Sequence, residues 1–90
     1  MAVCLIINVP GASLEQYDQV RQGLGAPLGE GQISHVAGPT EDGICVVDVW
    51  DSRADFDRFL QEKLGEQLGR AGVPEPQITE FPVHSSETRA

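Results

Sequence analysis

The sequence predicts an α+β domain in which two helices cover one face of a four-stranded antiparallel sheet. Apolar, β-branched runs alternate along the chain with segments whose apolar residues recur at helical spacing. The order of these segments is strand, helix, strand, strand, helix, strand. Glycine and proline mark the junctions between them, and 90 residues is the size of one domain.

The first strand is expected over residues 2–9, where the run AVCLIINV ends at a Pro-Gly pair. Both alternating sets of side chains are apolar, which predicts burial on both faces, although Asn8 interrupts the second set. Ser13 and Gln16 then have the spacing of a capping box, which marks the start of a helix. The apolar stripe of this helix is Leu14, Tyr17, Val20 and Leu24. A glycine-rich loop over residues 25–31 follows it.

Residues 32–38 and 44–50 are predicted to form a hairpin around a connection rich in Pro, Asp and Gly. The expected register pairs Gly38 with Gly43, His35 with Val46, and Ile33 with Asp48. One face of the sheet then carries His35, Asp48 and Trp50, with His35 and Asp48 as diagonal neighbours. If the true register differs by one residue, the side chains of one strand lie on the opposite face of the sheet relative to those of the other strand.

Ser52 is expected to cap a second helix that runs to about Gly69 or Gly72. Its buried stripe is Phe56, Phe59, Leu60, Leu64 and Leu68. The spacing of these side chains indicates that one face of the helix packs on the sheet.

The last strand is expected over residues 77–84. Pro82 has no amide hydrogen to donate, which places this strand at an edge of the sheet. Residues 85–90 are polar and predict a flexible C-terminal tail, so that residues 1–84 form a single folded domain.

This order of elements is the ferredoxin-like βαββαβ arrangement, in which right-handed crossovers place both helices on one face of the sheet. The other face has no cover within the chain, yet Cys45, Val47 and Val49 are apolar there. An uncovered apolar sheet face marks an interaction surface. A second copy related by a two-fold axis is the simplest cover, so the sequence predicts a homodimer.

The charge of the chain limits its partners. Fourteen acidic and 6 basic residues give a net charge of −8. Nucleic acids and anionic membranes both attract basic surfaces, so neither is expected as a partner. The longest apolar run, residues 3–7, is far shorter than the ~20 residues that span a bilayer, and no basic segment precedes it as in a secretory signal. We therefore expect a cytoplasmic chain.

The two cysteines, Cys4 and Cys45, lie in apolar strand-like runs and are interpreted as small buried hydrophobic residues. A disulfide between neighbouring strands remains the alternative. The spacings Cys-x-x-Cys, His-x-x-x-His and Asp-x-Asp-x-Asn-Gly do not occur. No metal site is therefore expected.

Five residues are candidates for a site. The carboxylate of Asp48 would orient the imidazole of His35 and raise its basicity, as a general base requires, unless the two form a merely structural pair. Tyr17 faces the sheet and Trp50 ends the third strand, so both either line the same cavity or pack in the core. His84 either reaches the mouth of the cavity or the partner chain, or ends its strand in solvent.

Four segments resemble the dimeric α/β-barrel superfamily: PGASLEQYDQV, HVAGPTEDG, VVDVWDSRADFDRFL and FPVH. This superfamily includes cofactor-independent antibiotic biosynthesis monooxygenases, polyketide cyclases and haem-degrading enzymes, and the likeness is greatest to its small uncharacterised members. The resemblance implies a dimer with two ferredoxin-like sheets packed face to face. It also implies that Asn8 and Trp50 match an Asn and a Trp that line the pocket in the monooxygenase and haem-degrading relatives. The second helix lacks the histidine that ligates haem, so haem is not expected.

We therefore expect an enzyme that acts on a small, largely apolar molecule such as a polyketide or a phenol, without a metal or an organic cofactor. Cyclisation, isomerisation and oxygenation all suit a histidine base. Oxygenation is supported by the resemblance at Asn8 and Trp50, and cyclisation by His35 with Asp48. The alternative is a non-catalytic dimeric module that binds a small molecule or serves as an assembly subunit.

Overall fold

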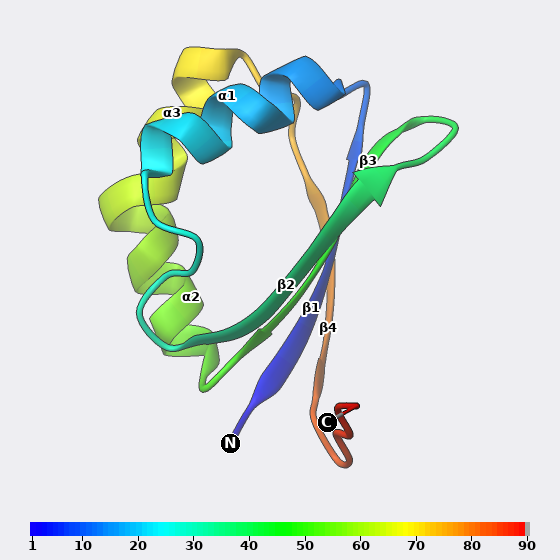
Figure 1. Ribbon diagram of the computed structural model, residues 1–90, viewed down its shortest axis with the longest axis vertical. Helices are drawn as coiled ribbons and strands as arrows, with labels where there is room; N and C mark the ends of the chain where they lie inside the picture. The colour runs from blue at the N-terminus through cyan, green and yellow to red at the C-terminus, as the bar shows by residue number, and fades with distance from the viewer. Residues whose placement is uncertain (90) are drawn as a thin grey trace.

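The computed structural model describes residues 1–89 and contains the predicted order of elements. The strands are β1 (Val3–Pro10), β2 (Gln32–Pro39), β3 (Gly43–Trp50) and β4 (Gln77–Pro82). The helical segments are α1 (Leu14–Leu24), α2 (Arg53–Phe59), a π-helical turn η1 (Leu60–Leu64) and α3 (Gly65–Ala71). The strands form one antiparallel sheet in the order β2-β3-β1-β4, and the helices lie on one face of it (Figure 1). The predicted ferredoxin-like fold is thereby confirmed.

Helix α1 begins with the predicted capping box. The Ser13 hydroxyl accepts a hydrogen bond from the backbone N–H of Gln16 (3.1 Å), and the Gln16 side chain accepts one from the N–H of Ser13 (3.0 Å). The helix ends at Gly25, whose φ of 76° lies in the left-handed region that favours glycine. Leu14 belongs to the apolar stripe that the sequence indicated, but its side chain is 51% exposed. At about 100° per residue, Leu14 lies a quarter turn from the centre of the face that Val20 and its neighbours turn inward.

The second predicted helix is continuous but contains the π turn η1. The Ser52 hydroxyl accepts from the N–H of Asp55 (3.2 Å) and caps the N-terminus. The N–H of Gly65 donates to the carbonyl of Leu60, five residues earlier, which widens the helix at this turn. A side-chain carbon at position 65 would lie 2.9 Å from that carbonyl oxygen, so glycine permits the turn. The helix ends before Gly72, as predicted.

The register of the β2–β3 hairpin differs from the predicted one by two residues. His35 lies directly opposite Asp48, and Val46 lies opposite Ala37. Because side chains alternate with a period of two, this difference keeps each of these side chains on its predicted face. His35 and Asp48 therefore share a face, as direct partners and not as diagonal ones.

A bulge between Gln32 and Ser34 changes the start of β2. The extra residue reverses the alternation of side chains before it. The prediction that Ile33 shares the face of His35 is therefore wrong, because Ile33 is 52% exposed and Gln32 lies opposite Trp50.

Strand β1 lies at the centre of the sheet between β3 and β4, which explains why it is apolar on both faces. Strand β4 is an edge strand, as Pro82 predicted, but it ends there and not at residue 84. Residues 83–89 contain no helix or strand, and residue 90 of the predicted tail lies outside the described residues. No helix within residues 1–89 is both long and apolar enough to cross a membrane.

The core lies where helix α2 meets the first half of β1 and the end of β3. Leu5, Trp50 and Phe56 are its most deeply buried side chains. The indole of Trp50 meets the ring of Phe56 edge-on at a centroid distance of 5.7 Å and lies 5.3 Å from the ring of Phe59. The apolar stripe predicted for the second helix thus supplies the helical half of the core.

The substitution Leu5→Ala is expected to lower the free energy of unfolding by about 2–5 kcal/mol, because it leaves a cavity beneath the aromatic cluster. Urea denaturation at one protein concentration measures this change. The matched control is Leu28→Ala, which truncates an exposed leucine of the loop before β2 and is expected to change stability by less than about 0.5 kcal/mol. Equal effects of the two substitutions would contradict this assignment of the core.

Candidate functional site

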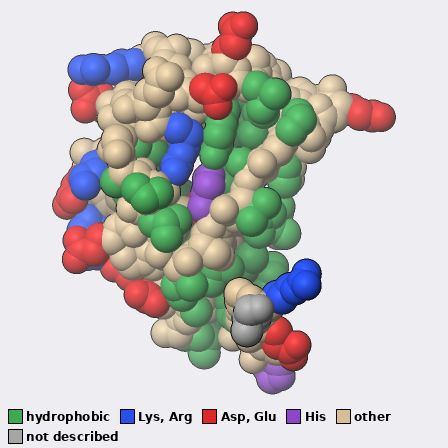
Figure 2. Space-filling view, in the orientation of Figure 1, with side chains coloured by type: hydrophobic (Ala, Val, Ile, Leu, Met, Phe, Trp, Pro, Cys, Tyr) green, Lys and Arg blue, Asp and Glu red, His purple; other side chains and the backbone are tan. Residues whose placement is uncertain are grey.

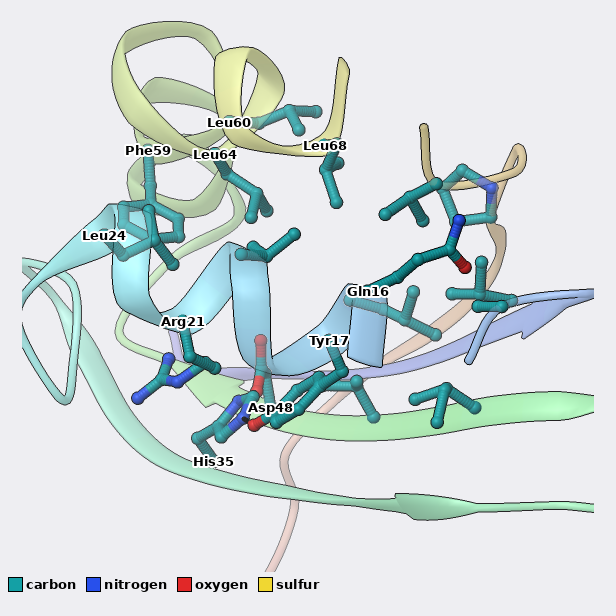
Figure 3. A pocket seen from close by; sticks show the side chains of 18 of the residues that line it. Gln16, Tyr17, Arg21, Leu24, His35, Asp48, Phe59, Leu60, Leu64 and Leu68 are labelled. Carbon is teal, nitrogen blue, oxygen red and sulfur yellow. Dashed lines mark hydrogen bonds and ion pairs between the residues drawn. The ribbon is translucent and has the colours of Figure 1, made fainter. Parts of the chain in front are cut away.

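A cavity of about 130 Å³ lies between the sheet and the helices. Its walls are largely apolar and come from both layers, with Ile7, Val9, Ile44 and Val46 from the sheet and Leu24, Leu60, Leu64 and Leu68 from the helices. Figure 2 shows a hollow between the two layers, in which a histidine and a basic side chain are visible. Figure 3 shows Tyr17, His35 and Asp48 together on one side of the cavity, opposite the leucines of the second helix, and Gln16 apart from them.

The polar side of the cavity is a continuous chain of hydrogen-bonded side chains. The Tyr17 hydroxyl lies 2.6 Å from Nε2 of His35, and Nδ1 of His35 lies 2.6 Å from Oδ1 of Asp48. The indole N–H of Trp50 donates to the other carboxylate oxygen, Oδ2, at 3.4 Å. Three elements thus contribute: Tyr17 from α1, His35 from β2, and the remaining two residues from β3 (Figure 3).

Asp48 determines the proton positions in this chain. A carboxylate can only accept, so Nδ1 of His35 carries the proton that points at Asp48. In a neutral imidazole Nε2 is then an acceptor, and the hydroxyl of Tyr17 donates to it. The oxygen of Tyr17 keeps its own acceptor capacity, so the chain ends at the cavity in a phenol that can both give and receive a proton.

Burial is the main cause of the raised pKa of Tyr17. It raises the pKa of the phenol above the ordinary value, because the phenolate would be poorly solvated there. The negative charge of Asp48, and to a smaller extent that of Asp18, raises this pKa further, whereas the guanidinium of Arg21 lowers it. Tyr17 is therefore a neutral phenol in the resting protein at neutral pH.

The structure brings together three of the six predicted site residues. Tyr17, His35 and Asp48 line one cavity and are hydrogen-bonded to one another. The sequence predicted His35 with Asp48 as a pair and Tyr17 as a neighbour in the same cavity. It did not predict that Tyr17 binds directly to the imidazole.

Trp50 does not line the cavity, contrary to the prediction. Its side chain is completely buried in the core, where Gly29 of the preceding loop closes over it. A side-chain carbon at position 29 would lie 2.9 Å from the indole ring. The tryptophan contacts the cavity lining indirectly, through its hydrogen bond to Asp48 and through its packing against Phe56 and Phe59.

Asn8 and His84 are also placed differently from the prediction. Asn8 pairs with Cys45 and Gln77, which puts it on the sheet face away from the helices, and it is exposed. His84 follows the end of β4, where it is exposed and does not line the cavity. The alternation of side chains along β1 already assigned Asn8 to the other face, and only the family resemblance favoured the pocket.

Three polar residues of the cavity, Gln16, Arg21 and Gln32, were not predicted as site residues. Arg21 is four residues after Tyr17 on α1, so helical spacing places both on one side of the helix. Gln32 lines the cavity because of the β2 bulge, and its side-chain oxygen accepts from the N–H of Gly29 at 2.8 Å. The position of Arg21 was readable from the sequence, whereas that of Gln32 depends on a bulge without a sequence signal.

Cys4 and Cys45 are both free and are not paired with each other. Both lie on the sheet face away from the helices, where Cys4 is opposite Val49 and Cys45 is opposite Asn8. Within residues 1–89, no three side chains of His, Cys, Asp or Glu come together in a way that could hold a metal ion.

Comparison with solved structures identifies the fold. No protein-family model matches the chain, and no curated protein matches it in sequence. A candidate antibiotic biosynthesis monooxygenase from Chloroflexus aurantiacus J-10-fl is similar over 98% of both chains, with a TM-score of 0.72 and 18% identity. SnoaB, a cofactor-independent oxygenase from Streptomyces nogalater, is similar over 94% of this chain and 95% of its own, with a TM-score of 0.66 and 14% identity.

A candidate antibiotic biosynthesis monooxygenase from Deinococcus radiodurans covers 100% of this chain and 99% of its own, with a TM-score of 0.63 and 16% identity. The chain shares the ferredoxin-like fold of these proteins. The resemblance that the sequence segments indicated is thereby confirmed at the level of the fold. One such fold hosts many reactions, so the chemistry has to be argued from the site.

The pKa of Tyr17 is expected to lie above the ordinary 10.0, because burial and Asp48 disfavour the phenolate. The chain has one tyrosine, so the ultraviolet absorbance of the phenolate reports this residue alone. The folded-state pKa exceeds the unfolded one, so the resulting stability is fully present below about pH 10 and is lost as the pH rises through the folded-state pKa.

The Asp48→Asn variant is the control for this titration. It removes the charge but keeps the burial, so the midpoint is expected to fall only part of the way back. Circular dichroism at each pH verifies that the protein is folded. A midpoint at or below the ordinary value in the folded wild-type protein would contradict the burial of the hydroxyl.

Proposed function

We propose that the chain is an enzyme that transfers protons on a small, largely apolar ring compound bound in the cavity, with its own side chains as acid and base. The observation that carries this proposal is the unbroken hydrogen-bond chain from Tyr17 through His35 to Asp48 at the wall of an apolar cavity. For Tyr17 to accept a proton from a substrate, a neighbouring base has to accept the phenol proton, and a carboxylate has to stabilise the resulting imidazolium. Both are present.

Proton transfer runs along this chain in two linked steps. As the oxygen of Tyr17 takes a proton from a C–H or O–H group of the substrate, its own proton passes to Nε2 of His35. The substrate is left as an enolate or phenolate, and the imidazolium is stabilised by the carboxylate of Asp48, 2.6 Å away. Return of the proton to a different substrate atom completes an isomerisation or precedes a ring closure, with no net change in oxidation state.

The size of the cavity limits the substrate. A dry apolar cavity of about 150 Å³ binds benzene. The volume of about 130 Å³ between the sheet and the helices is therefore suited to one ring. A phenol or a cyclic 1,3-dicarbonyl compound fits this size and carries a proton acidic enough for the chain to remove.

Oxygenation is the second candidate, and the fold likeness to the oxygenase SnoaB favours it. If oxygenation begins with removal of a proton from the substrate, the same three residues would serve. The residues by which the sequence supported oxygenation do not line the cavity, since Asn8 lies on the other face and Trp50 in the core. Isomerisation or cyclisation therefore has the stronger support from the site.

The proposed base is tested by proton exchange, which requires no knowledge of the natural product. Phenols and cyclic 1,3-diketones with one ring are incubated with the protein in deuterated water, and loss of their C–H signals is followed by NMR. Tyr17→Phe and His35→Ala are each expected to lower the catalysed rate by about 10²–10⁴-fold. Asp48→Asn is expected to lower it less, because the amide still holds the ring but cannot stabilise an imidazolium.

The His84→Ala variant is the matched control, because this histidine is exposed and does not line the cavity. Its exchange rate is expected to equal that of the wild-type protein. Loss of exchange in this variant with retention in His35→Ala would reverse the assignment of the base. Binding of the ring compounds without exchange in any form of the protein would favour the non-catalytic module.

The sheet face away from the helices supports a homodimer as the functional unit. Its apolar side chains include Ile6, Val36, Val47, Val49 and Phe81. Val36 is 67% exposed and Phe81 is also exposed, so apolar side chains of this face meet solvent alongside polar ones such as Asn8. A second copy of the chain, placed by a two-fold axis, would cover this face with the same apolar surface.

Light scattering coupled to size exclusion is expected to give twice the mass of the 9.7 kDa chain. The Val36→Lys variant is expected to be a monomer, because it buries an unpaired charge in the interface. Its net charge is less negative than that of the wild-type protein, so stronger repulsion between copies cannot explain dissociation. Leu28→Lys makes the same charge change on an exposed loop and should remain a dimer. A wild-type monomer at micromolar concentration would contradict the proposal.

A further inference from the structure

We infer that Arg21 is a carboxylate-binding residue and that the cavity takes a planar carboxylic acid with one ring. This inference rests on the proposed function, because it names the class of substrate for the same cavity. It is independent of which atoms of the substrate exchange protons.

Arg21 is the one arginine among the residues that line the cavity, and no lysine lies among them. Within residues 1–89, the guanidinium of Arg21 has one hydrogen-bond partner, the carbonyl oxygen of Pro27, to which Nη2 donates at 2.6 Å. A guanidinium has five N–H donors, so one such bond leaves most of them free for a ligand. Figure 3 shows Arg21 on α1, one turn from Tyr17 and on the polar side of the cavity where His35 lies.

The other arginines of the helical layer are paired with carboxylates. Arg53 pairs with Asp57 and Glu80, Arg58 with Asp55, and Arg70 with Glu66. Within residues 1–89, no carboxylate lies within 4.0 Å of the guanidinium of Arg21, although the chain has 14 acidic residues. The chain is acidic, yet Arg21 lies at the cavity without an acidic partner. A negatively charged ligand could therefore form the ion pair that the protein does not supply.

The cavity contains no other charge that is available to a ligand. Asp48 is the only acidic residue of the lining, and both of its oxygens are bound, one by His35 and the other by Trp50. The polar side therefore presents the phenol of Tyr17, the imidazole of His35 and the positive charge of Arg21. An anionic group on the substrate complements this set, whereas a cationic group would meet Arg21 without compensation.

The planar shapes of a guanidinium and a carboxylate narrow the class of ligand further. A guanidinium binds a carboxylate through two parallel hydrogen bonds in one plane. Most of the remaining lining is apolar and the cavity is of single-ring size, so a ring that carries a coplanar carboxylate suits both features. The influence of Arg21 on the pKa of Tyr17 is consistent with a guanidinium close to the phenol that would face the ring.

Binding of benzoate and of benzamide to the full chain tests the inference, because the two rings are matched and only benzoate is charged. Both are titrated by calorimetry and by NMR, with the single Trp50 indole N–H signal as a reporter beside Asp48. The wild-type protein is expected to bind benzoate about 10- to 100-fold more tightly than benzamide, the range for one charge-assisted contact. Arg21→Gln should abolish this preference and leave the affinity for benzamide unchanged.

Arg70→Gln is the matched control, since it removes the same charge from an exposed ion pair with Glu66 on α3. It is expected to keep the preference for benzoate. Arg21→Lys keeps the charge but loses the planar fork, and it should show an intermediate preference. Arg21→Lys also serves as the test variant if Arg21→Gln does not fold.

The outcomes separate the two proposals. Equal affinity of the wild-type protein for benzoate and benzamide, or a preference that survives in both Arg21 variants, would overturn the role of Arg21 and leave the proposed function intact. A preference for benzoate that Arg70→Gln also loses would assign it to overall charge and would likewise overturn the inference. Failure of both compounds to bind the wild-type protein would refute the single-ring cavity on which both proposals rest.

Discussion

The polar side of this protein depends on one buried carboxylate. Asp48 lies in the middle of an apolar strand, where a charge is stable only if hydrogen bonds replace the water that it loses. His35 on the neighbouring strand and Trp50 two residues later supply them. Because both carboxylate oxygens are bound, the imidazole has one orientation, and its other nitrogen is aimed at Tyr17. Loss of one partner of a buried charge costs about 3–5 kcal/mol, so the site and the fold are stabilised together.

The cavity exists because the helical layer does not pack evenly on the sheet. At one end the Trp50, Phe56 and Phe59 rings fill the space between the layers. Beyond this cluster, Leu60 and Leu64 of the π turn and Leu68 of α3 form a wall of the cavity. Gly65 allows the wider turn where a side chain would meet the Leu60 carbonyl.

The fold was predictable from the sequence because its signals are local. The capping box at Ser13, the Pro82 edge strand and the period of each element are short-range features. The shared face of His35 and Asp48 was also predictable, because a register error of two residues preserves faces. The exact partners were not, since the turn residues allow more than one register and the bulge at Gln32 has no signal.

The incorrect placement of Trp50 and Asn8 in the cavity has a different physical cause. The depth of Trp50 depends on how Gly29 and the aromatic rings pack around it, and no spacing rule describes that packing. Asn8 was assigned to the pocket against the alternation of its own strand, so the local geometry was the better guide. A family resemblance at low identity indicates the fold, whereas the side chains that reach a cavity are determined by strand parity and bulges.

The two proposals are linked through electrostatics. Arg21 opposes Asp48 in its effect on Tyr17, because a positive charge favours the phenolate. A carboxylate bound to the guanidinium would cancel much of that effect and hold Tyr17 more firmly as a neutral phenol. The same added negative charge would stabilise the positive charge that forms on His35 when the proton moves inward. A bound carboxylate would therefore favour the neutral phenol and the imidazolium, whereas a neutral analogue of the same shape would not, and the same negative charge would oppose the one that forms on the ring.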